Sequence, residues 1–558
     1  MVTATLLQGT PVVAGVVHAP VCHVRAEIDP ARLRAYREQP PVEVEEALDA
    51  YDVAVAAVVE GFTARAEAAE GSAAEVLTAS ASLARDRGMR GTVKKNLTAG
   101  QPLLEAIDAA VEHFAGVFSS MGGLMAERVT DLRDIGRRVT AHVVGAPEPG
   151  VPVPTTPSVV VAEDLAPADS AGLDPAMVAA LVMERGGSTS HTAIIARQLG
   201  IPCLVGTPGA LDLEEGVLVL VDGTAGTVEL DVDADAARRR VEAAATARAE
   251  VDAWTGPATT SDGAPVTLLA NVADPASAAA AAEGPVDGVG LFRTELAFLA
   301  STTEPSVEEQ ADLYAGVLGP FGTDRHVVTR TLDAGSDKPI AFATMPDEEN
   351  PALGVRGYRL SFDKPDLLER QLDALKIAGE RVGTHPWVMA PMIATADEAA
   401  DFAAKARARG LKPGVMVEIP SAALLAHQLL EHVDFLSIGT NDLTQYTMAA
   451  DRMATDLTHL TDPWQPAVLH LVAITAAAGR AVGKSVGVCG EAAADPQLAC
   501  VLVGMGVTSL SMAAASVRAV GVQLGKVTTV QCEAAAEAAL GAGDPQAARA
   551  AVREVLEG

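Results

Sequence analysis

The spacing of apolar and polar positions divides the chain into stretches of different character. Residues 1–21 and about 158–223 contain short Val- and Leu-rich runs separated by Gly and Pro, which predicts short strands. Residues 29–145 carry apolar side chains at helical spacing within long Ala-, Glu- and Arg-rich segments, which predicts a bundle of about four helices. Because strand-like runs flank the bundle on both sides, we interpret it as an insertion in a small β/α domain.

Residues 262–525 repeat another pattern, in which a short apolar run is followed by a helix-like segment. Eight runs stand at residues 266–273, 288–295, 326–334, 387–393, 414–420, 433–442, 485–491 and 507–513. Eight such units favour a (β/α)8 barrel, and the alternative is an open doubly wound sheet. The barrel is favoured because polar residues lie at the carboxyl ends of the runs, where barrel enzymes have their active sites: Asn271, Arg293, Arg330, Glu418, Asn441, Asp442 and Cys489.

These patterns predict a multidomain α/β protein with the following domain bounds. A β/α domain takes residues 1–28 and 146–231, a helical domain residues 29–145, a charged linker helix residues 232–258, and the barrel residues 259–558. No apolar run approaches the roughly 20 residues needed to span a bilayer. The amino-terminal residues lack the basic and apolar regions of a signal peptide.

Composition narrows the classes of partner and compartment. The 558 residues carry a formal net charge of −32, which disfavours nucleic acid and anionic membranes as partners and favours a basic one. An anionic substrate would need a local cluster of arginines to overcome this charge. The five cysteines are odd in number and have no C-x-x-C spacing, which indicates neither a disulfide framework nor a zinc site and fits a reducing cytoplasm.

One histidine has a setting suited to phosphate chemistry. In ERGGSTSHTAIIARQLGIP (184–202), two glycines and four hydroxyl residues surround His191, and a helix is predicted from just after it to near Gly200. The free N–H groups of a helix N-terminus favour anions. His191 could therefore attack phosphorus, with amides and hydroxyls holding the product. The alternative is a structural or surface histidine, but none of the other ten histidines has this setting.

Several long motifs accompany this histidine along the chain. They are GVGLFRTELAFL, RTLDAGSDKP, ENPALGVRGYR, GVMVEIPSA, DFLSIGTNDLTQYTMAADR and GVCGEAA. With GGSTSHTAIIAR, they resemble enzyme I of the phosphoenolpyruvate-dependent sugar phosphotransferase system over essentially the whole length. The resemblance implies a phosphoenolpyruvate-binding barrel, a swivelling phosphohistidine domain, and a helical domain that binds the phosphocarrier protein HPr. It also implies a homodimer joined through the barrel domain.

The resemblance further implies an activity and roles for individual residues. The enzyme would phosphorylate itself from phosphoenolpyruvate, release pyruvate and pass the phosphoryl group to a histidine of HPr, the first step of sugar uptake. His191 would be the phosphorylated residue, supported by Ser170 and Thr189. The remaining roles would fall to Arg293, Arg330, Arg452, Arg356, Asn441 and Asp442 for the substrate, Glu418 and Asp442 for Mg²⁺, and Cys489 for protonation of the enolate carbon.

The chemistry of these residue types agrees with those roles. Arginines present planar charged forks that suit carboxylate and phosphate. Mg²⁺ prefers hard oxygen ligands and commonly takes one or two carboxylates together with substrate oxygens. A thiol can deliver a proton to carbon once phosphorus leaves.

Two other functions compete with this interpretation. A pyruvate phosphate dikinase or phosphoenolpyruvate synthase would share the histidine and barrel domains but would need a large ATP-binding domain. The residues before the histidine domain instead read as helices without a Gly-rich nucleotide loop, which argues against ATP. A non-catalytic regulator that kept the fold would be expected to have lost a matched position, and none is lost.

Overall fold

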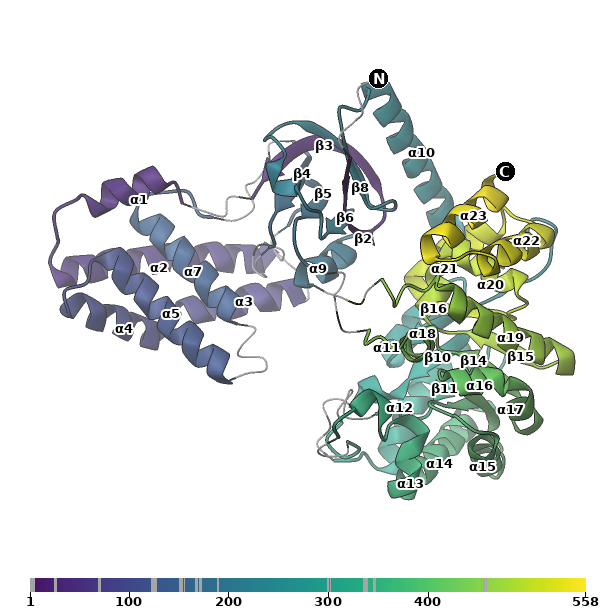
Figure 1. Ribbon diagram of the computed structural model, residues 1–558. Helices are drawn as coiled ribbons and strands as arrows, with labels where there is room; N and C mark the ends of the chain where they lie inside the picture. The colour runs from purple at the N-terminus through teal and green to yellow at the C-terminus, as the bar shows by residue number, and fades with distance from the viewer. Residues whose placement is uncertain are drawn as a thin grey trace. The chain divides into compact units, whose positions relative to one another are not determined.

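The computed structural model describes residues 6–24, 28–68, 72–121, 128–149, 154, 156–165, 169, 173–187, 190–298, 301, 303–334, 340–344, 348–452, 454, 457 and 459–558. The chain forms two compact units, residues 1–248 and residues 249–558 (Figure 1). None of the helices in these described ranges combines the length and the apolar character needed to cross a membrane.

The first unit contains an eight-stranded sheet with the order β1-β8-β7-β3-β4-β5-β6-β2. Its strands are β1 (Leu6–Gln8), β2 (Thr10–Val13), β3 (Val16–His23), β4 (Ser158–Ala162), β5 (Val178–Met183), β6 (Cys203–Val205), β7 (Leu218–Asp222) and β8 (Thr227–Leu230). Strand β3 pairs antiparallel with β7 and parallel with β4. The amino-terminal strands therefore complete the sheet, and the prediction of an inserted helical region is confirmed.

The inserted region forms more helices than the sequence predicts. Instead of about four, the described residues form α1 (Pro30–Arg37), α2 (Val44–Ala68), α3 (Ser72–Ala84), α4 (Arg87–Thr98), α5 (Leu103–Met121) and α7 (Val129–Val143). The core around Phe62 takes residues from α2, α3, α4, α5 and α7, whereas α1 buries none. The difference arises at caps such as Asp86, which starts α4 by accepting a hydrogen bond from the Met89 amide, 3.0 Å away. Apolar residues recur at helical spacing on both sides of such a cap, so their pattern does not show where one helix ends and the next begins.

The second unit is a closed barrel of eight parallel strands. They are β9 (Thr267–Val272), β10 (Val289–Arg293), β11 (Val327–Arg330), β12 (Trp387–Ala390), β13 (Lys412–Val417), β14 (Phe435–Ile438), β15 (Ser485–Val488) and β16 (Ser509–Ala513). Each of the eight predicted runs overlaps one strand, and the barrel prediction is confirmed. The open-sheet alternative is wrong because β9 pairs with both β10 and β16 and closes the ring.

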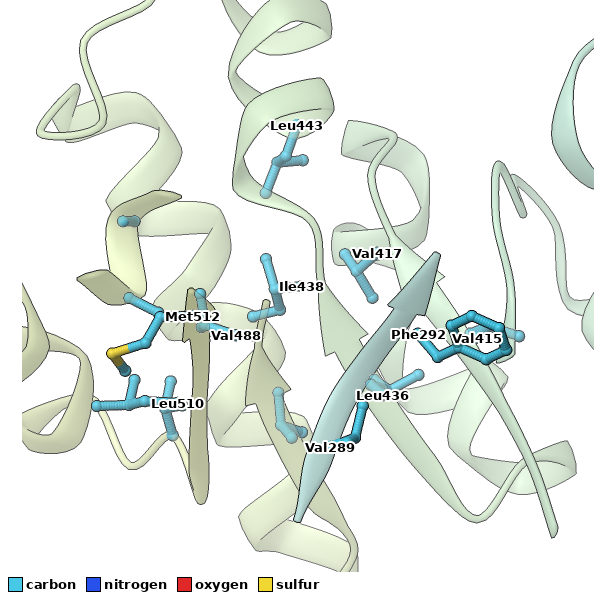
Figure 2. Close-up of a cluster of buried hydrophobic side chains, with 14 of the residues drawn as sticks. Val289, Phe292, Val415, Val417, Leu436, Ile438, Leu443, Val488, Leu510 and Met512 are labelled. Atoms are coloured by element: carbon cyan, nitrogen blue, oxygen red, sulfur yellow. The ribbon is translucent and has the colours of Figure 1, made fainter. Parts of the chain in front are cut away.

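This barrel is surrounded by helices, the last two of which pack on other helices rather than on the strands. They are α11 (Pro275–Ala282), α12 (Val307–Leu318), α13 (Leu360–Asp363), α14 (Pro365–Val382), α15 (Ala396–Arg407), α16 (Pro420–Leu424), α17 (Ala426–His432), α18 (Thr440–Met448), α19 (Pro466–Val482), α20 (Pro496–Gly504), α21 (Ala514–Leu524), α22 (Thr529–Leu540) and α23 (Pro545–Glu557). Figure 2 shows the apolar layer between strands and helices, to which Leu436 and Ile438 of β14 contribute.

The inner face of the barrel has its own cluster of side chains. It consists of Leu291, Val328, Met389, Met416, Phe435 and Cys489. Successive residues of a strand point to opposite faces, so each strand supplies both layers, and both are buried. This explains why the sequence shows continuous apolar runs rather than clean alternation.

A long charged helix links the two units along the chain. Helix α10 (Ala234–Ala253) carries the boundary between them, at residues 248 and 249. Only Ala237 of this helix is buried, which fits the predicted solvated linker helix. The exact domain bounds given by the sequence patterns stay predictions.

Candidate active site

The predicted polar residues gather at the carboxyl-terminal end of the barrel. Arg293 and Arg330 are the last residues of β10 and β11, and Glu418 directly follows β13. Cys489 follows β15, and Asp442 lies in the first turn of α18, which begins two residues after β14. All the strands run parallel, so these chain positions reach the same rim of the barrel.

Arg330 is held at this rim by carboxylates. Its side chain is buried, Nη2 donates to Oε1 of Glu295, and Nη1 lies 3.1 Å from Oδ2 of Asp333. Nη1 also lies 3.9 Å from Oε1 of Glu418. The carboxylates raise the pKa of the guanidinium above its usual value although burial opposes the rise. The buried Nε has no hydrogen-bond partner among the described residues, which leaves one donor for a ligand.

Arg293 has a different environment at the end of the neighbouring strand. Its side chain is partly exposed and makes no hydrogen bond or ion pair with any described residue. A charged fork at a barrel rim, with no ion-pair partner among the described residues, is suited to an incoming anion. Its predicted role on the substrate stays a prediction.

Arg356 is the most deeply buried cation of this end of the barrel. It is 0% exposed, and its Nη2 donates to both carboxylate oxygens of Asp333 at 3.2 and 3.1 Å. Its Nη1 donates to Oδ1 of Asp442 at 3.2 Å and to the hydroxyl of Tyr446 at 3.3 Å. The guanidinium therefore bridges two carboxylates, one of them a predicted metal ligand. Direct contact of Arg356 with substrate stays a prediction.

The two predicted metal ligands are both buried carboxylates. Glu418 is 1% and Asp442 is 4% exposed, and Oε2 of Glu418 accepts a hydrogen bond from the Met392 amide at 3.0 Å. Burial raises the pKa of Glu418 to about 7, and the charges of Asp442 and Asp333 add to the rise. Negative charge is thus crowded here, and an added cation would stabilise the ionised form of Glu418.

Arg452 and Asn441 lie close to Asp442 along the chain. Nη1 of Arg452 is 3.7 Å from Oδ2 of Asp442, and its backbone amide donates to Gln445 at 3.1 Å. Oδ1 of Asn441 accepts a hydrogen bond from the Glu491 amide at 3.2 Å, which ties α18 to the segment after Cys489.

Cys489 occupies the inner face of the barrel just below this rim. It is 2% exposed, and its Sγ lies 3.6 Å from the carbonyl oxygen of Ile438, to which it donates. Burial raises the pKa of the thiol to about 11, although the neighbouring Ser437 side chain opposes the rise. The residue is therefore a protonated thiol at neutral pH, as a proton donor needs to be.

The histidine segment of the first unit forms the predicted helix. Helix α9 (His191–Leu199) begins at His191, and the Ser190 side chain caps it by accepting a hydrogen bond from the Ala193 amide at 3.3 Å. Gly200 ends it in the left-handed conformation. The hydroxyl of Thr192 is buried and donates to Asp164 at 3.2 Å, so it fixes the helix to the end of β4. The backbone at His191 thus lies where a helix N-terminus favours anions.

Three of the predicted positions lie wholly or partly outside the described residues. Ser170 and Thr189 lie outside the described residues, as does the side chain of His191. The neighbour of Ser170, Asp169, is bound by Arg138 of α7, and burial raises the pKa of its carboxyl to about 6. This contact joins the helical bundle to the segment that precedes β5.

Sequence reasoning missed the acidic residues that hold the arginines. Glu295 and Asp333 stand within the quoted motifs GVGLFRTELAFL and RTLDAGSDKP, yet neither was assigned a role. Both are buried, at 6% and 0% exposed. The sequence did contain a signal for them, because each acidic residue lies two or three positions beyond an arginine at the end of a strand. Their partners could not be read from that spacing alone.

Comparison with known proteins gives a consistent result. Residues 248–529 match the family model of the PEP-binding domain of PEP-utilising enzymes, residues 154–226 that of their mobile domain, and residues 8–128 that of their N-terminal domain. The chain is 47% identical to a phosphoenolpyruvate-protein phosphotransferase of Streptomyces coelicolor over 99% of this chain and 100% of that protein.

Two further relatives have the same name. The protein of Haloferax volcanii is 40% identical over 87% of this chain and 86% of its own length. That of Bacillus subtilis is 35% identical over 87% of this chain and 88% of its own length. With this identity and coverage, and with all three domain models matched, the chain belongs to the phosphoenolpyruvate-protein phosphotransferase (enzyme I) family of PEP-utilising enzymes.

Proposed function

We propose that this protein transfers the phosphoryl group of phosphoenolpyruvate to His191, releases pyruvate, and passes the group to a histidine of the phosphocarrier protein HPr. One observation carries the first half of the proposal. Arginines, buried carboxylates and a protonated thiol share one end of the barrel, in a chain whose net charge is −32. Such a chain needs a local cationic site to bind a small anion.

The arginines supply the anchors for the substrate. Arg293 has no ion pair with a described residue, and Arg330 keeps its Nε without a partner among them. Phosphoenolpyruvate carries a phosphate and a carboxylate, and two or three guanidinium groups can bind both. Phosphoryl transfer depends mainly on positioning and on neutralising charge, which these groups provide.

Glu418 and Asp442 are suited to hold Mg²⁺. They offer hard oxygen ligands. Burial, with the added charge of Asp442, raises the pKa of Glu418 to about 7, and a divalent cation would stabilise its ionised form. No group of three or more acidic, His or Cys side chains among the described residues could hold a metal alone. This is consistent with Mg²⁺, which commonly completes its shell with water and substrate oxygens. When bound, the ion would neutralise charge on the transferred phosphate.

Cys489 is the proposed acid for the carbon that must gain a proton. The Sγ–H bond breaks as a C–H bond forms on the methylene carbon of the enolate, giving pyruvate and a thiolate. A pKa of about 11 keeps the proton on sulfur until the enolate, a strong base, is formed.

His191 receives the phosphoryl group and then gives it to the carrier. The N-terminal position of His191 in α9 supports this, because the orphan amides of that helix stabilise added negative charge. We place carrier binding on the helical bundle, and the acidic balance of the chain favours a basic carrier surface. A swivel of the histidine domain about residues 145–157 and α10 would let His191 serve both partners.

The remaining expectations concern assembly and compartment. The homodimer through the barrel domain stays a prediction. All five cysteines are buried and none forms a disulfide, which supports the reducing cytoplasm as the place of action.

Labelling with ³²P-phosphoenolpyruvate and Mg²⁺ tests the proposal. Wild-type protein is expected to gain an acid-labile, alkali-stable phosphate, which purified HPr then removes. His191→Ala should gain none. His113→Ala, which changes an exposed histidine of α5, is the matched control and should label like wild type.

Two results would contradict the proposal. Labelling of His191→Ala at the wild-type level would exclude this residue as the acceptor. Labelling from γ-³²P-ATP instead of phosphoenolpyruvate would favour the dikinase-type alternative.

A further inference from the structure

Hydroxyl groups and glycines occupy part of the barrel interior below Cys489, where large apolar side chains usually pack. Strand register places Ser437 of β14 beside Gly487 of β15, and Gly487 beside Ser509 of β16. A Cβ atom at Gly487 would lie 2.5 Å from Oγ of Ser509. The Ser509 hydroxyl thus lies close over Gly487, where a larger residue would not fit, and we call Ser437, Gly487 and Ser509 the hydroxyl row.

The direction of Ser437 follows from its neighbours. Leu436 and Ile438 belong to the apolar layer between strands and helices (Figure 2). Phe435 and Cys489 belong to the inner cluster. Because side chains alternate along a strand, Ser437 points to the barrel interior, on the side of Cys489.

A cavity lies along the hydroxyl row. Its volume is about 30 Å³, and its lining includes four serines: Ser437, Ser485, Ser509 and Ser511. A polar cavity of this size can hold at least one water molecule. Its lining also contains His326 and Trp387, at the amino-terminal ends of β11 and β12, so it extends from below Cys489 toward the end of the barrel opposite the rim.

Direct contacts connect this cavity to Cys489. Ser437 is a diagonal neighbour of Cys489 across the β14–β15 pair, because it lies opposite Gly487 and the Cys489 amide donates to the carbonyl oxygen of Ile438 at 3.0 Å. The Ser437 side chain lowers the pKa of the thiol while burial raises it. On the other side, Oγ of Ser511 donates to Oδ1 of Asn271 at 2.6 Å, and Nδ2 of Asn271 donates to the carbonyl oxygen of Cys489 at 3.2 Å. The cysteine is therefore linked to the cavity through both its side chain and its backbone.

We propose that Ser437 returns a proton to Cys489 after each turnover, drawing it from water in the cavity below. This inference rests on the proposed role of Cys489 as the acid that protonates the enolate. Once its proton has moved to carbon, the thiolate takes the proton of the neighbouring Ser437 hydroxyl. As it does so, Ser437 takes a proton from water in the cavity, and the hydroxide left there is neutralised by a proton from solvent, so one solvent proton is consumed per pyruvate formed.

The reason for such a path is the burial of the thiol. Cys489 is only 2% exposed, so contact with bulk water is small. Bound substrate would cover the rim and leave the barrel interior as the remaining route. Among the described residues, Ser437 shares no hydrogen bond with a predicted substrate ligand. It is a positioning and relay residue that acts through Cys489.

Exchange in D₂O tests the relay without the carrier. Phosphorylated enzyme, Mg²⁺, phosphoenolpyruvate and ¹³C-pyruvate are mixed, and NMR follows two rates: entry of ¹³C into phosphoenolpyruvate and entry of deuterium into pyruvate. The first reports chemistry and the second reports how often the thiol exchanges its proton with solvent. In wild type we expect deuterium entry to keep pace with ¹³C exchange.

Ser437→Ala should separate the two rates. We expect ¹³C exchange within a few-fold of wild type and a ratio of deuterium entry to ¹³C exchange at least about tenfold lower, in the range typical of a lost proton-transfer group. Ser437→Thr retains the hydroxyl and should restore the ratio. Thr329→Val is the matched control, because it removes a buried hydroxyl from β11 outside the cavity lining, and it should not change the ratio.

The outcomes distinguish the relay from the proposed function. A wild-type ratio in Ser437→Ala overturns the relay, as does an equal fall of both rates, which would show a purely structural role. Cys489→Ala provides the other arm. If that variant keeps wild-type ¹³C exchange, the proposed acid is wrong. If it loses exchange while Ser437→Ala keeps a normal ratio, only the relay fails.

Discussion

Replacement of Arg356 by methionine tests the buried charge cluster that supports the barrel rim. The substitution keeps much of the side-chain volume but removes the charge that bridges Asp333 and Asp442. Removal of one partner of a buried ion pair costs about 3–5 kcal/mol. Both carboxylates keep a second cation, since Asp333 lies 3.1 Å from Arg330 and Asp442 lies 3.7 Å from Arg452. We therefore expect the lower end of that range, about 3 kcal/mol.

Urea unfolding followed by tryptophan fluorescence measures this loss in the barrel unit. The three tryptophans, Trp254, Trp387 and Trp464, all belong to residues 249–558, so the signal reports this unit. Arg370→Met is the matched control, because Arg370 makes a comparable pair with Glu304 at 2.6 Å while its side chain is 41% exposed. An exposed pair contributes about 0–1 kcal/mol, and the control should lose no more than that.

A double-mutant cycle identifies the cause of the loss. Asp333→Asn combined with Arg356→Met should lose less stability than the two single variants together, with a coupling energy of about 1–3 kcal/mol. Strict additivity, or a loss in Arg356→Met no greater than in Arg370→Met, would refute the view that the buried pair supports the rim.

Three further predictions address other parts of the chain. Gly490→Ala would place a Cβ 1.9 Å from Oγ1 of Thr440. We therefore expect the free energy of unfolding in urea to fall by about 1–3 kcal/mol and phosphoenolpyruvate labelling to be slower. Gly543→Ala is the control and should change neither, because no atom lies within 4 Å of its new Cβ. Burial lowers the pKa of His326, so the unfolded chain takes up the proton at a higher pH than the folded chain, and stability falls as the pH drops below about 6.5. His326→Phe should therefore make the urea midpoint depend less on pH between pH 7 and 5. An unchanged pH dependence would contradict this. Ser190→Ala removes the cap of α9, and faster amide hydrogen exchange in residues 191–199 should report a local loss of about 0.5–1 kcal/mol, with a smaller effect for Ser190→Gly.

The sequence alone determined the barrel strands and the place of the chemistry along them. Parallel strands buried on both faces need Val- and Leu-rich runs bounded by turns, and such runs can be recognised in the sequence alone. The sequence also predicts the strand ends, because Arg293, Arg330 and Cys489 interrupt or directly follow apolar runs. The helix after His191 was equally clear, since Ser190 and Gly200 are typical cap residues. The number of helices in the bundle could not be predicted from the sequence, because caps such as Asp86 do not interrupt the helical spacing of apolar residues.

Only the tertiary structure decided which of these polar residues contact one another. Arg293 and Arg330 are the same residue type at the same place on adjacent strands, yet one is bound by carboxylates and the other has no pair among the described residues. Arg356 meets Asp442 across 86 residues of chain, and the hydroxyl row joins three strands through their register. Local sequence sets the type of element and the face of each side chain. The closure and register of the barrel set the partners, because ion pairs and hydrogen bonds depend on distances of a few ångströms between distant segments.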